Sequence, residues 1–137
     1  METDFSQSVI FPKGKPTPEQ FSKYFIGQSY LSMLTGFDTN VPIGNVTFEP
    51  GCRNNWHYHP GGQILLVTGG RGWYQEWGKS AKELHAGDVV NIPKNVKHWH
   101  GAAKNSWFVH LAVEAGASEG PAVWMGPVID DEYNKLS

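Results

Sequence analysis

The sequence predicts an all-β protein whose antiparallel strands form a barrel or a sandwich. Its composition is poor in charged residues (18%) and rich in aromatic residues (13%), in Gly (16) and in Pro (9). Such a composition favours short strands and tight turns over a helical bundle. From residue 21 onward, short runs of β-branched and aromatic residues alternate with Gly, Pro and Asn at a spacing of about ten residues, which is typical of barrels and sandwiches. A chain of 137 residues is long enough for one domain with its own core.

An N-terminal arm at residues 1–18 is expected to precede a single domain at residues 19–137. Three prolines and a glycine interrupt regular structure in the second half of this arm: Pro12, Gly14, Pro16 and Pro18. The tripeptide Val9-Ile10-Phe11 just before them has the composition of a short strand that pairs elsewhere.

The domain itself is expected to contain eight strands and one short helix. The sequence Gly-Gly-Arg-Gly at residues 69–72 indicates a tight hairpin between two strands. Only the tail from Asp130 to Leu136 has a helical pattern, with Asp130 or Asp131 as its N-cap. We place the strands at residues 24–34, 43–49, 53–59, 62–68, 71–77, 88–92, 97–100 and 106–114.

Charge and hydropathy argue against several function classes. The formal net charge is -2, and the eleven Lys and Arg are scattered, so no basic stripe suits a nucleic-acid backbone. No apolar run approaches the roughly 18 residues that a membrane span needs. The first residues lack the apolar core of a secretory signal, and Cys52 is the only cysteine, so no internal disulfide is expected. These features predict a protein of the reducing cytoplasm that acts on a small molecule.

Histidines are concentrated in one half of the chain, because all six lie between residues 57 and 110. His57 and His59 occupy alternate positions of a strand-like stretch, where side chains share a face with Cα atoms roughly 6.5–7 Å apart. Two such imidazoles can bind one ion at metal–nitrogen distances of about 2.1 Å. After a Pro-Gly-Gly turn, the amide of Gln63 can reach the same point, and His98 on a later strand can supply a third imidazole.

Taken alone, a His-x-His pair is most often an exposed polar face, but here two spacings fit one template. Gly51, His57, His59, Gln63 and Gly70 fit the first motif of the cupin fold, with Gln where Glu is usual. Gly87, Pro93 and His98 fit the second motif, with Asn95 where Gly is usual and Ala102 where Asn is usual. The chain therefore resembles the cupins, whose antiparallel barrel is of the jelly-roll, or double-stranded β-helix, type.

A narrower resemblance concerns the small cupins that include the manganese-dependent bacterial hydroxynitrile lyases. The segments that carry it are VTFEPG (46–51), WHYHPGGQILLVTGGRGWYQE (56–76), HAGDVVNIPKNVKHWHGAA (85–103) and HLAVE (110–114). This resemblance implies that manganese is the metal and that His110 faces it as the general base. It also implies that a cyanohydrin loses its hydroxyl proton to His110 and splits into an aldehyde and cyanide. Glu114 departs from the pattern, because such a lyase has Gln at this position.

Three imidazoles and one amide oxygen are all neutral donors, so a divalent ion bound by these four ligands alone keeps its full charge and is a strong Lewis acid. Four protein ligands on an octahedral ion leave two positions for substrate or water. The mixed nitrogen and oxygen set suits one Mn, Fe, Ni, Co or Zn ion per chain, and the spacing does not select among them.

Further residues are candidates for the wall of the substrate pocket. His100 shares strand parity with His98, so both side chains are expected on one face. His110 lies on a strand whose two faces are both apolar, so periodicity does not decide whether it points inward. We read His85 as structural or exposed. The remaining pocket candidates are Val46, Phe48, Leu65, Trp73 and Glu114.

These patterns leave three functions open. The leading hypothesis is a metal-dependent lyase that combines a Lewis acid with a histidine base. The first alternative is an iron-dependent dioxygenase, and the second is a non-catalytic module that holds a small ligand. We also expect a homodimer or homotetramer, because Phe5, Val9, Ile10 and Phe11 give the arm an apolar surface that can add to a neighbour's sheet edge.

Overall fold

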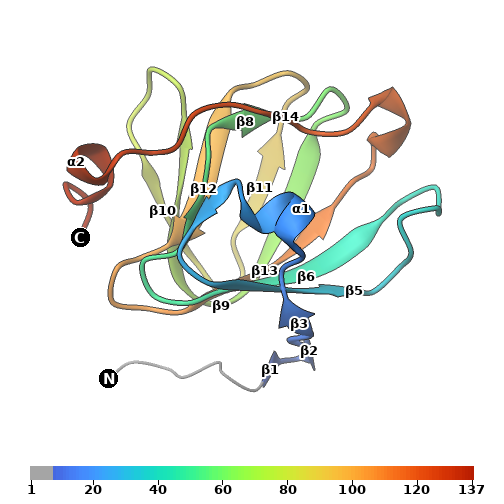
Figure 1. Ribbon diagram of the computed structural model, residues 1–137, viewed down its shortest axis with the longest axis horizontal. Coiled ribbons are helices and arrows are strands. Elements are labelled where there is room, and N and C mark those ends of the chain that lie inside the picture. Colours follow the sequence, from blue (N-terminus) through green and yellow to red (C-terminus); the bar gives the residue numbers. More distant parts are fainter. Residues whose placement is uncertain (1–7) are drawn as a thin grey trace.

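The computed structural model describes residues 8–137, and almost all of its regular structure is antiparallel strand (Figure 1). In chain order the elements are β1 (Ser8–Val9), β2 (Phe11–Pro12), β3 (Lys15–Pro16), α1 (Glu19–Ser22), β4 (Phe25–Ile26), β5 (Ser29–Met33), β6 (Ile43–Phe48), β7 (Arg53–Asn54), β8 (His57–Tyr58), β9 (Gln63–Glu76), β10 (Lys82–His85), β11 (Val89–Ile92), β12 (His98–Ala102), β13 (Phe108–Val113), the 3-10 helix η1 (Ala117–Glu119), β14 (Val123–Trp124) and α2 (Asp130–Tyr133). None of the helices within residues 8–137 is long and apolar enough to cross a membrane.

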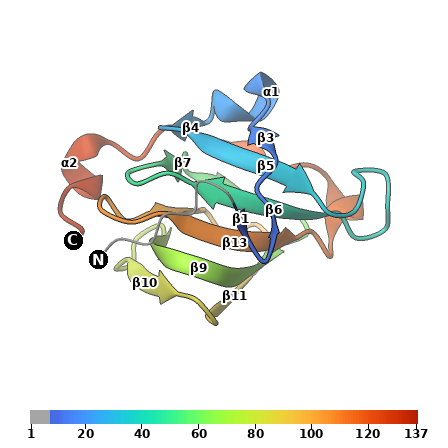
Figure 2. The ribbon, with the colours of Figure 1, turned by 90° about the horizontal axis from the view of Figure 1, so that it is seen from below.

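The strands curl into an antiparallel half-barrel, and the long strand β9 joins its two sides. The first part of β9 pairs with β11 and β13, and its last part pairs with β10 and β12. From β13 the sheet continues through β6 and β5 to β3, and Figure 2 shows β5, β6, β13 and β9 side by side. The fold class predicted from the sequence is therefore confirmed.

The glycine-rich stretch at residues 69–72 is not a hairpin, so that prediction is wrong. It lies inside β9, where the pairing with β13 skips Thr68, because Val109 faces Gly69 and His110 faces Val67. Gly70 has φ +75°, and a Cβ atom there would lie 1.9 Å from the carbonyl oxygen of Trp107. Only glycine fits so close an approach, and the extra residue bends the strand from one side of the half-barrel to the other.

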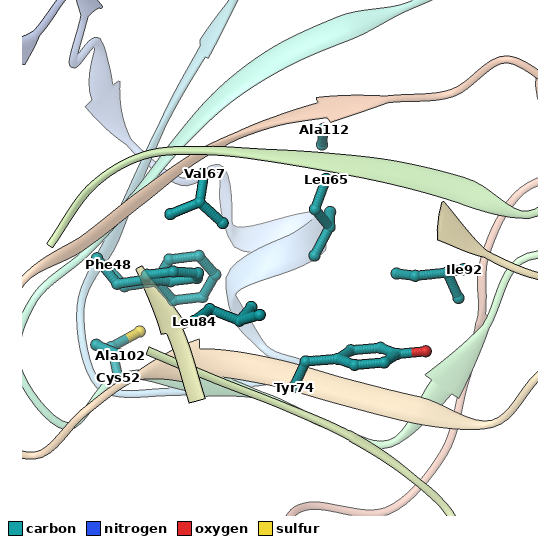
Figure 3. Close-up of a cluster of buried hydrophobic side chains, with 10 residues drawn as sticks. Phe48, Cys52, Leu65, Val67, Tyr74, Leu84, Ile92, Ala102 and Ala112 are labelled. Atoms are coloured by element: carbon teal, nitrogen blue, oxygen red, sulfur yellow. The ribbon is translucent and has the colours of Figure 1, made fainter. Parts of the chain in front are cut away.

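The bulge also changes which residues of β9 face the interior. Before it, Leu65 and Val67 are buried, and after it Gly72 and Tyr74 are buried, so the inward positions change from odd to even numbers. Figure 3 shows Leu65 and Val67 on one side of the core and Tyr74 on the other. The main core consists of Phe48, Cys52, Leu65, Val67, Tyr74, Leu84, Ile92, Ala102, Phe108 and Ala112.

The C-terminal tail is held by a buried arginine. The guanidinium of Arg53, which is only 3% exposed, donates to the carbonyl oxygen of Val128 at 2.7 and 3.0 Å and pairs with Asp130 at 2.7 Å. It also lies 4.1 Å above the ring of Tyr133. The expected C-terminal helix is present, but neither Asp130 nor Asp131 caps it, because Ile129 occupies the N-cap position and Asp130 is engaged by Arg53.

The N-terminal arm covers an edge of the chain's own sheet. β3 pairs with β5, and β1 and β2 form a small hairpin that presents Ile10 to solvent. The amide of Asn45 on β6 donates to the carbonyl oxygen of Pro12 at 2.8 Å, which ties the hairpin to the sheet. Phe5, which contributed to the expected apolar surface of the arm, lies outside the described residues.

Candidate metal centre and adjoining cavity

A cavity of about 490 Å³ opens into the interior of the half-barrel, within the size range of small-molecule sites. Much of its wall is apolar and comes from several elements, with contributions from Phe25, Leu31, Met33, Val46, Phe48 and Trp124. Its polar lining includes His57, His59, Gln63, His100 and His110. Polar groups that converge at one place in an apolar cavity are the usual composition of a binding or catalytic site.

His57 and His98 face each other across the β8–β12 pair, and their ring centroids are 4.3 Å apart. The Nδ1 atom of each ring contacts a backbone carbonyl oxygen two residues earlier, that of Asn55 at 2.8 Å and that of Val96 at 2.9 Å. A carbonyl oxygen only accepts, so Nδ1 carries the proton in both rings and Nε2 keeps its lone pair. Burial lowers the pKa of His98 to about 4 and the pKa of His57 well below its usual value, so both rings are neutral.

His59 and Gln63 reach the same region from the turn between β8 and β9. The turn is closed by the amide of Gly62, which donates to the carbonyl oxygen of His59 at 3.0 Å. The carboxylate of Glu114 lies behind both side chains. It accepts a hydrogen bond from Nε2 of Gln63, and its other oxygen is 3.3 Å from Nδ1 of His59.

These contacts leave a set of buried donor atoms without partners. Among the described residues, Nε2 of His59, Oε1 of Gln63 and Nε2 of His98 have no hydrogen-bond partner. Buried polar atoms are nearly always satisfied, so several orphaned atoms in one place indicate that something else binds there. Imidazole nitrogens and an amide oxygen are suitable ligands for a divalent transition metal, so these residues fit the metal that the motifs imply.

A metal ion could also be held by a second combination of histidines. The ligand atoms of His57, His98 and His100 lie within 4.8 Å of one another, so these three residues are placed to hold an ion. His59 is not in that group, and its ring centroid lies 5.1 Å from that of His57 and 5.7 Å from that of His98. The distinction between the two combinations depends on the hydrogen bonds of His100.

Asn54 determines how His100 presents its two nitrogens. The backbone amide of His100 donates to Oδ1 of Asn54 at 2.9 Å, which turns the Asn54 amide nitrogen toward Nε2 of His100 at 3.1 Å. The amide nitrogen of Asn54 can only donate, so Nε2 of His100 accepts and Nδ1 of the neutral His100 ring carries the proton. His100 therefore offers an N–H donor through Nδ1, which argues against a role as a metal ligand.

His110 lies beside His100 and is completely buried. Its ring centroid is 4.8 Å from that of His100 and 5.6 Å from that of Phe48. Within the described part of the chain, neither of its ring nitrogens has a hydrogen-bond partner. Burial lowers the pKa of His110 to about 4, so the ring is neutral at pH 7 and can accept a proton.

The other pocket candidates from the sequence divide into two sets. Val46, Phe48 and Glu114 line the cavity together with His100. Leu65 is instead completely buried in the main core. Trp73 points to the other side of β9 and packs against a separate cluster of Trp99, Val128 and Tyr133. The bulge in β9 lies between Leu65 and Trp73, so Leu65 faces the core and Trp73 faces the other side of the strand although both positions are odd-numbered.

Two residues of the site could not be found from the sequence. Asn54 has no motif that marks it, and its role follows only from its contact with His100 across β7 and β12. Trp124 stacks on His57 with ring centroids 4.4 Å apart, but it lies on the two-residue strand β14, which is too short to show a strand pattern. His85 is largely exposed, as expected, with 57% of its side chain accessible.

Comparison with known proteins agrees with this architecture. A family model described as "Cupin domain" matches residues 44–114, which is more than half of the chain. The chain is 46% identical to an (R)-mandelonitrile lyase from Granulicella tundricola over 95 residues, which cover 69% of this chain and 72% of that protein. A cupin-like protein from Thermotoga maritima has a crystal structure that matches with a TM-score of 0.86 and 46% identity, covering 93% of this chain and 96% of the other. A cupin-2 domain from Rhodospirillum rubrum matches with a TM-score of 0.67 over 98% of this chain and 86% of the other, and its 14% identity speaks for the fold alone. On these grounds the chain belongs to the cupin family.

Proposed function

We propose that this protein is a metal-dependent lyase that splits a cyanohydrin into an aldehyde and hydrogen cyanide, with His110 as the general base. One observation carries the proposal. The unpartnered donor atoms of His59 and Gln63 belong to residues that line the same apolar cavity as the neutral imidazole of His110, and His98, whose Nε2 is also unpartnered among the described residues, packs directly against His57 and His59. The identity of 46% to an (R)-mandelonitrile lyase supports this reaction class.

His57, His59, Gln63 and His98 would hold one divalent ion, and we propose manganese as that ion. When bound, such an ion polarises a substrate oxygen and lowers the pKa of a hydroxyl group. The protein contributes uncharged metal-binding atoms. The carbonyl oxygens of Asn55 and Val96 hold the protons of His57 and His98 on Nδ1, so that both Nε2 atoms keep their lone pairs.

The reaction then needs one proton acceptor and one hydrogen-bond donor from the chain. His110 accepts the hydroxyl proton of the cyanohydrin through a ring nitrogen. The carbon–cyanide bond breaks, its electron pair leaves with cyanide, and the carbon–oxygen bond becomes a carbonyl. The protonated His110 returns its proton to cyanide, so the products are an aldehyde and hydrogen cyanide. His100 offers its Nδ1–H to the anion as it departs.

The cavity also indicates what kind of substrate would fit. Its wall is formed largely by aromatic and aliphatic side chains, among them Phe25, Phe48 and Trp124, and it holds about 490 Å³. A hydrocarbon or aryl group would replace water against this wall, which is favourable at about 25 cal/mol per Å² of apolar surface buried. We therefore propose a cyanohydrin with an apolar or aromatic substituent.

Metal analysis and an activity assay on one preparation test this function. The protein is purified without added metal, its metal content is measured, and mandelonitrile is offered while benzaldehyde formation is followed by absorbance. We expect a bound divalent ion, aldehyde formation, and loss of that activity after chelation with recovery on adding Mn²⁺. Metal-bound protein that forms no aldehyde but consumes oxygen would overturn the lyase proposal and favour the iron-dependent dioxygenase.

We also propose that the chain assembles as a homodimer or homotetramer. Ile10 at the tip of the β1–β2 hairpin is 79% exposed, and a second copy would cover it. β3 pairs with β5 on one side and is the last strand of the sheet, so a neighbour could contact its outer edge as well as the hairpin. Light scattering at micromolar concentration is expected to give a mass above the 15.2 kDa of one chain, and deletion of residues 1–11 is expected to lower it. A monomeric mass for the full chain would contradict the assembly.

A further inference from the structure

The proposed metal donors are held in place in two different ways. His57 and His98 are each oriented by a backbone carbonyl oxygen on the segment that precedes them, Asn55 and Val96. His59 and Gln63 have no such carbonyl among their recorded hydrogen bonds in residues 8–137. Both instead meet the carboxylate of one residue, Glu114, which follows β13 on a different part of the half-barrel.

The carboxylate decides which end of the Gln63 amide faces the proposed metal position. An ionised carboxylate only accepts hydrogen bonds, so it selects Nε2 of Gln63, which is a donor. The amide oxygen of Gln63 is then turned away from Glu114, where it is buried and has no partner in the described chain. Without the carboxylate, nothing recorded in the structure distinguishes this orientation from the flipped one, in which an amide nitrogen that cannot bind a metal replaces the oxygen.

The same carboxylate acts on His59. Its second oxygen lies 3.3 Å from Nδ1, which favours the tautomer with the proton on Nδ1 and leaves the lone pair on the buried, unpartnered Nε2. Metal-binding histidines usually donate their other ring nitrogen to a carboxylate or carbonyl group, and the partner increases the affinity for the metal. Glu114 is close enough to take this role for His59 with a small adjustment of the ring. Glu114 can therefore serve two of the four donors at once.

Glu114 also changes the charge of the centre. Three imidazoles and one amide are neutral, so a divalent ion held by these four groups alone would leave an uncompensated double charge in a mostly buried site. The side chain of Glu114 is 26% exposed, and its negative charge stands directly behind Gln63 and His59. A glutamate at position 63 would bring a negative charge as a direct ligand. In this chain Glu114 supplies that charge from behind Gln63, through a hydrogen bond.

We propose that Glu114 is a positioning residue for the metal centre, which orients Gln63 and His59 and offsets the charge of the ion. This inference rests on the proposed metal-dependent function and deepens it. In this chain the neutral amide of Gln63 and the carboxylate of Glu114 behind it form one hydrogen-bonded unit.

The test is a metal titration and does not depend on turnover. Metal-free wild type and Glu114→Gln protein are titrated with Mn²⁺ in competition with a chelator, and the melting temperature of each metal-free protein is measured alongside. We expect the metal-free proteins to melt alike, because Glu114 is partly exposed, and we expect Glu114→Gln to bind Mn²⁺ about 10–100-fold more weakly. Glu119→Gln is the matched control, because it removes the same charge from the exposed end of η1 and should leave the affinity unchanged.

A second variant separates orientation from a general structural effect. If Glu114 acts through Gln63, then Glu114→Ala, which removes the acceptor that Glu114→Gln keeps, should cost less affinity in a Gln63→Ala background than in the wild type, because the amide it orients is already gone. The Co²⁺-loaded Glu114→Ala and Gln63→Ala proteins should also share a change in visible absorption, which reports the lost oxygen ligand. Equal Mn²⁺ affinity in wild type and Glu114→Gln, or equal costs of Glu114→Ala in both backgrounds, would overturn the inference while leaving the proposed function intact. Wild type that binds no divalent ion would overturn the proposed function itself.

Discussion

His98 and His110 are both fully buried, and burial lowers the pKa of each to about 4, yet their hydrogen bonds differ. His98 donates Nδ1–H to the carbonyl oxygen of Val96, which leaves one lone pair in a fixed direction. Neither ring nitrogen of His110 makes a hydrogen bond of good geometry within residues 8–137, and the backbone of Leu111 only partly offsets the effect of burial on its pKa, so its tautomer is held less firmly than that of His98. Burial and a lowered pKa therefore do not distinguish a metal-binding histidine from one that acts as a base. The hydrogen-bond partner of the second ring nitrogen does.

The largest expected effect comes from removing a metal-side histidine. His98→Ala deletes one of three imidazoles and should lose most of its metal and, with it, the activity. Gln63→Ala should lose less metal, because an amide oxygen is the weakest of the four donors. Metal content measured on both variants after purification without added metal checks the order.

His85→Ala is the control for this prediction, because His85 is largely exposed and outside the cavity. It should keep the metal content of the wild type. The proposed division into metal-binding and non-binding histidines would be wrong if His98→Ala also kept the wild-type metal content. It would also be wrong if His100→Ala lost the metal while His98→Ala did not.

The sequence predicts that His57, His59, Gln63 and His98 gather at one place, largely because three of them lie close together in the chain. The spacing of His57, His59 and Gln63 follows from strand alternation and one turn, and His98 follows from a second motif of the same kind. Glu114 is a pocket candidate from the sequence, but its contact with Gln63 and His59 could not be predicted. Glu114 is 51 residues from Gln63, and only the pairing of β13 with β9 brings the two together.

The wall of the cavity was harder to predict, because the sequence indicates two strands joined by a hairpin where the structure has one long strand with a bulge. In a strand without a bulge, alternation would place Leu65, Val67 and Trp73 on one side. The skipped Thr68 and the left-handed Gly70 move Trp73 to the outer face. Adjacent glycines are a signal for a bulge as well as for a hairpin, and local sequence does not choose between them.

The second prediction concerns His110, the histidine of this comparison that lacks a hydrogen-bond partner among the described residues. His110→Ala should keep its metal while its kcat falls by about 10²–10⁴-fold, because a positioned base typically contributes that much. The loss should appear in kcat more than in KM, since the proton moves in the transition state. Metal content, melting temperature and kcat are measured on one preparation. Full metal content with a near wild-type kcat would remove His110 from the mechanism.

The third prediction uses the lowered pKa of His110, which is faced by His100 from β12 and by Glu114 beyond the end of β13. The pKa is about 4 in the folded protein, below the ordinary value of 6.5, so between these values the unfolded chain binds a proton that the folded chain does not. The free energy of unfolding must then fall as the pH drops through this window, by on the order of 3 kcal/mol for a shift of this size.

Denaturant unfolding of the metal-free protein at pH 7 and pH 4.5 measures this loss of stability. His110→Gln, which cannot titrate, should lose less stability between the two pH values than the wild type does. The acid limb of the wild-type rate should likewise lie near pH 4 and not near the ordinary 6.5. Equal losses of stability in the wild type and in His110→Gln would show that His110 is not buried as a neutral ring.

The smallest expected effect on rate comes from Asn54, which orients His100 without contacting the proposed metal donors in any recorded hydrogen bond of residues 8–137. Asn54→Ala removes the acceptor for the backbone amide of His100 and the donor to its Nε2, so the proton of the neutral ring becomes free to move between the two nitrogens. Leaving the buried amide unsatisfied should cost about 1–3 kcal/mol of stability.

Asn54→Asp is the sharper variant, because it reverses one hydrogen bond and keeps the shape. A carboxylate accepts from the backbone amide of His100 as Asn54 does, but its second oxygen also accepts and therefore draws the proton of His100 to Nε2. Nδ1 then loses its N–H, and with it the hydrogen bond proposed for the departing anion. We expect kcat to fall roughly 10–100-fold, because one hydrogen bond to a charged group contributes about 1.5–3 kcal/mol, with no change in metal content. Imidazole ¹⁵N chemical shifts should show the proton on Nδ1 in the wild type and on Nε2 in Asn54→Asp. If the tautomer changes and the rate does not, His100 only fills the wall between His110 and the metal donors, and the donor role belongs to another group.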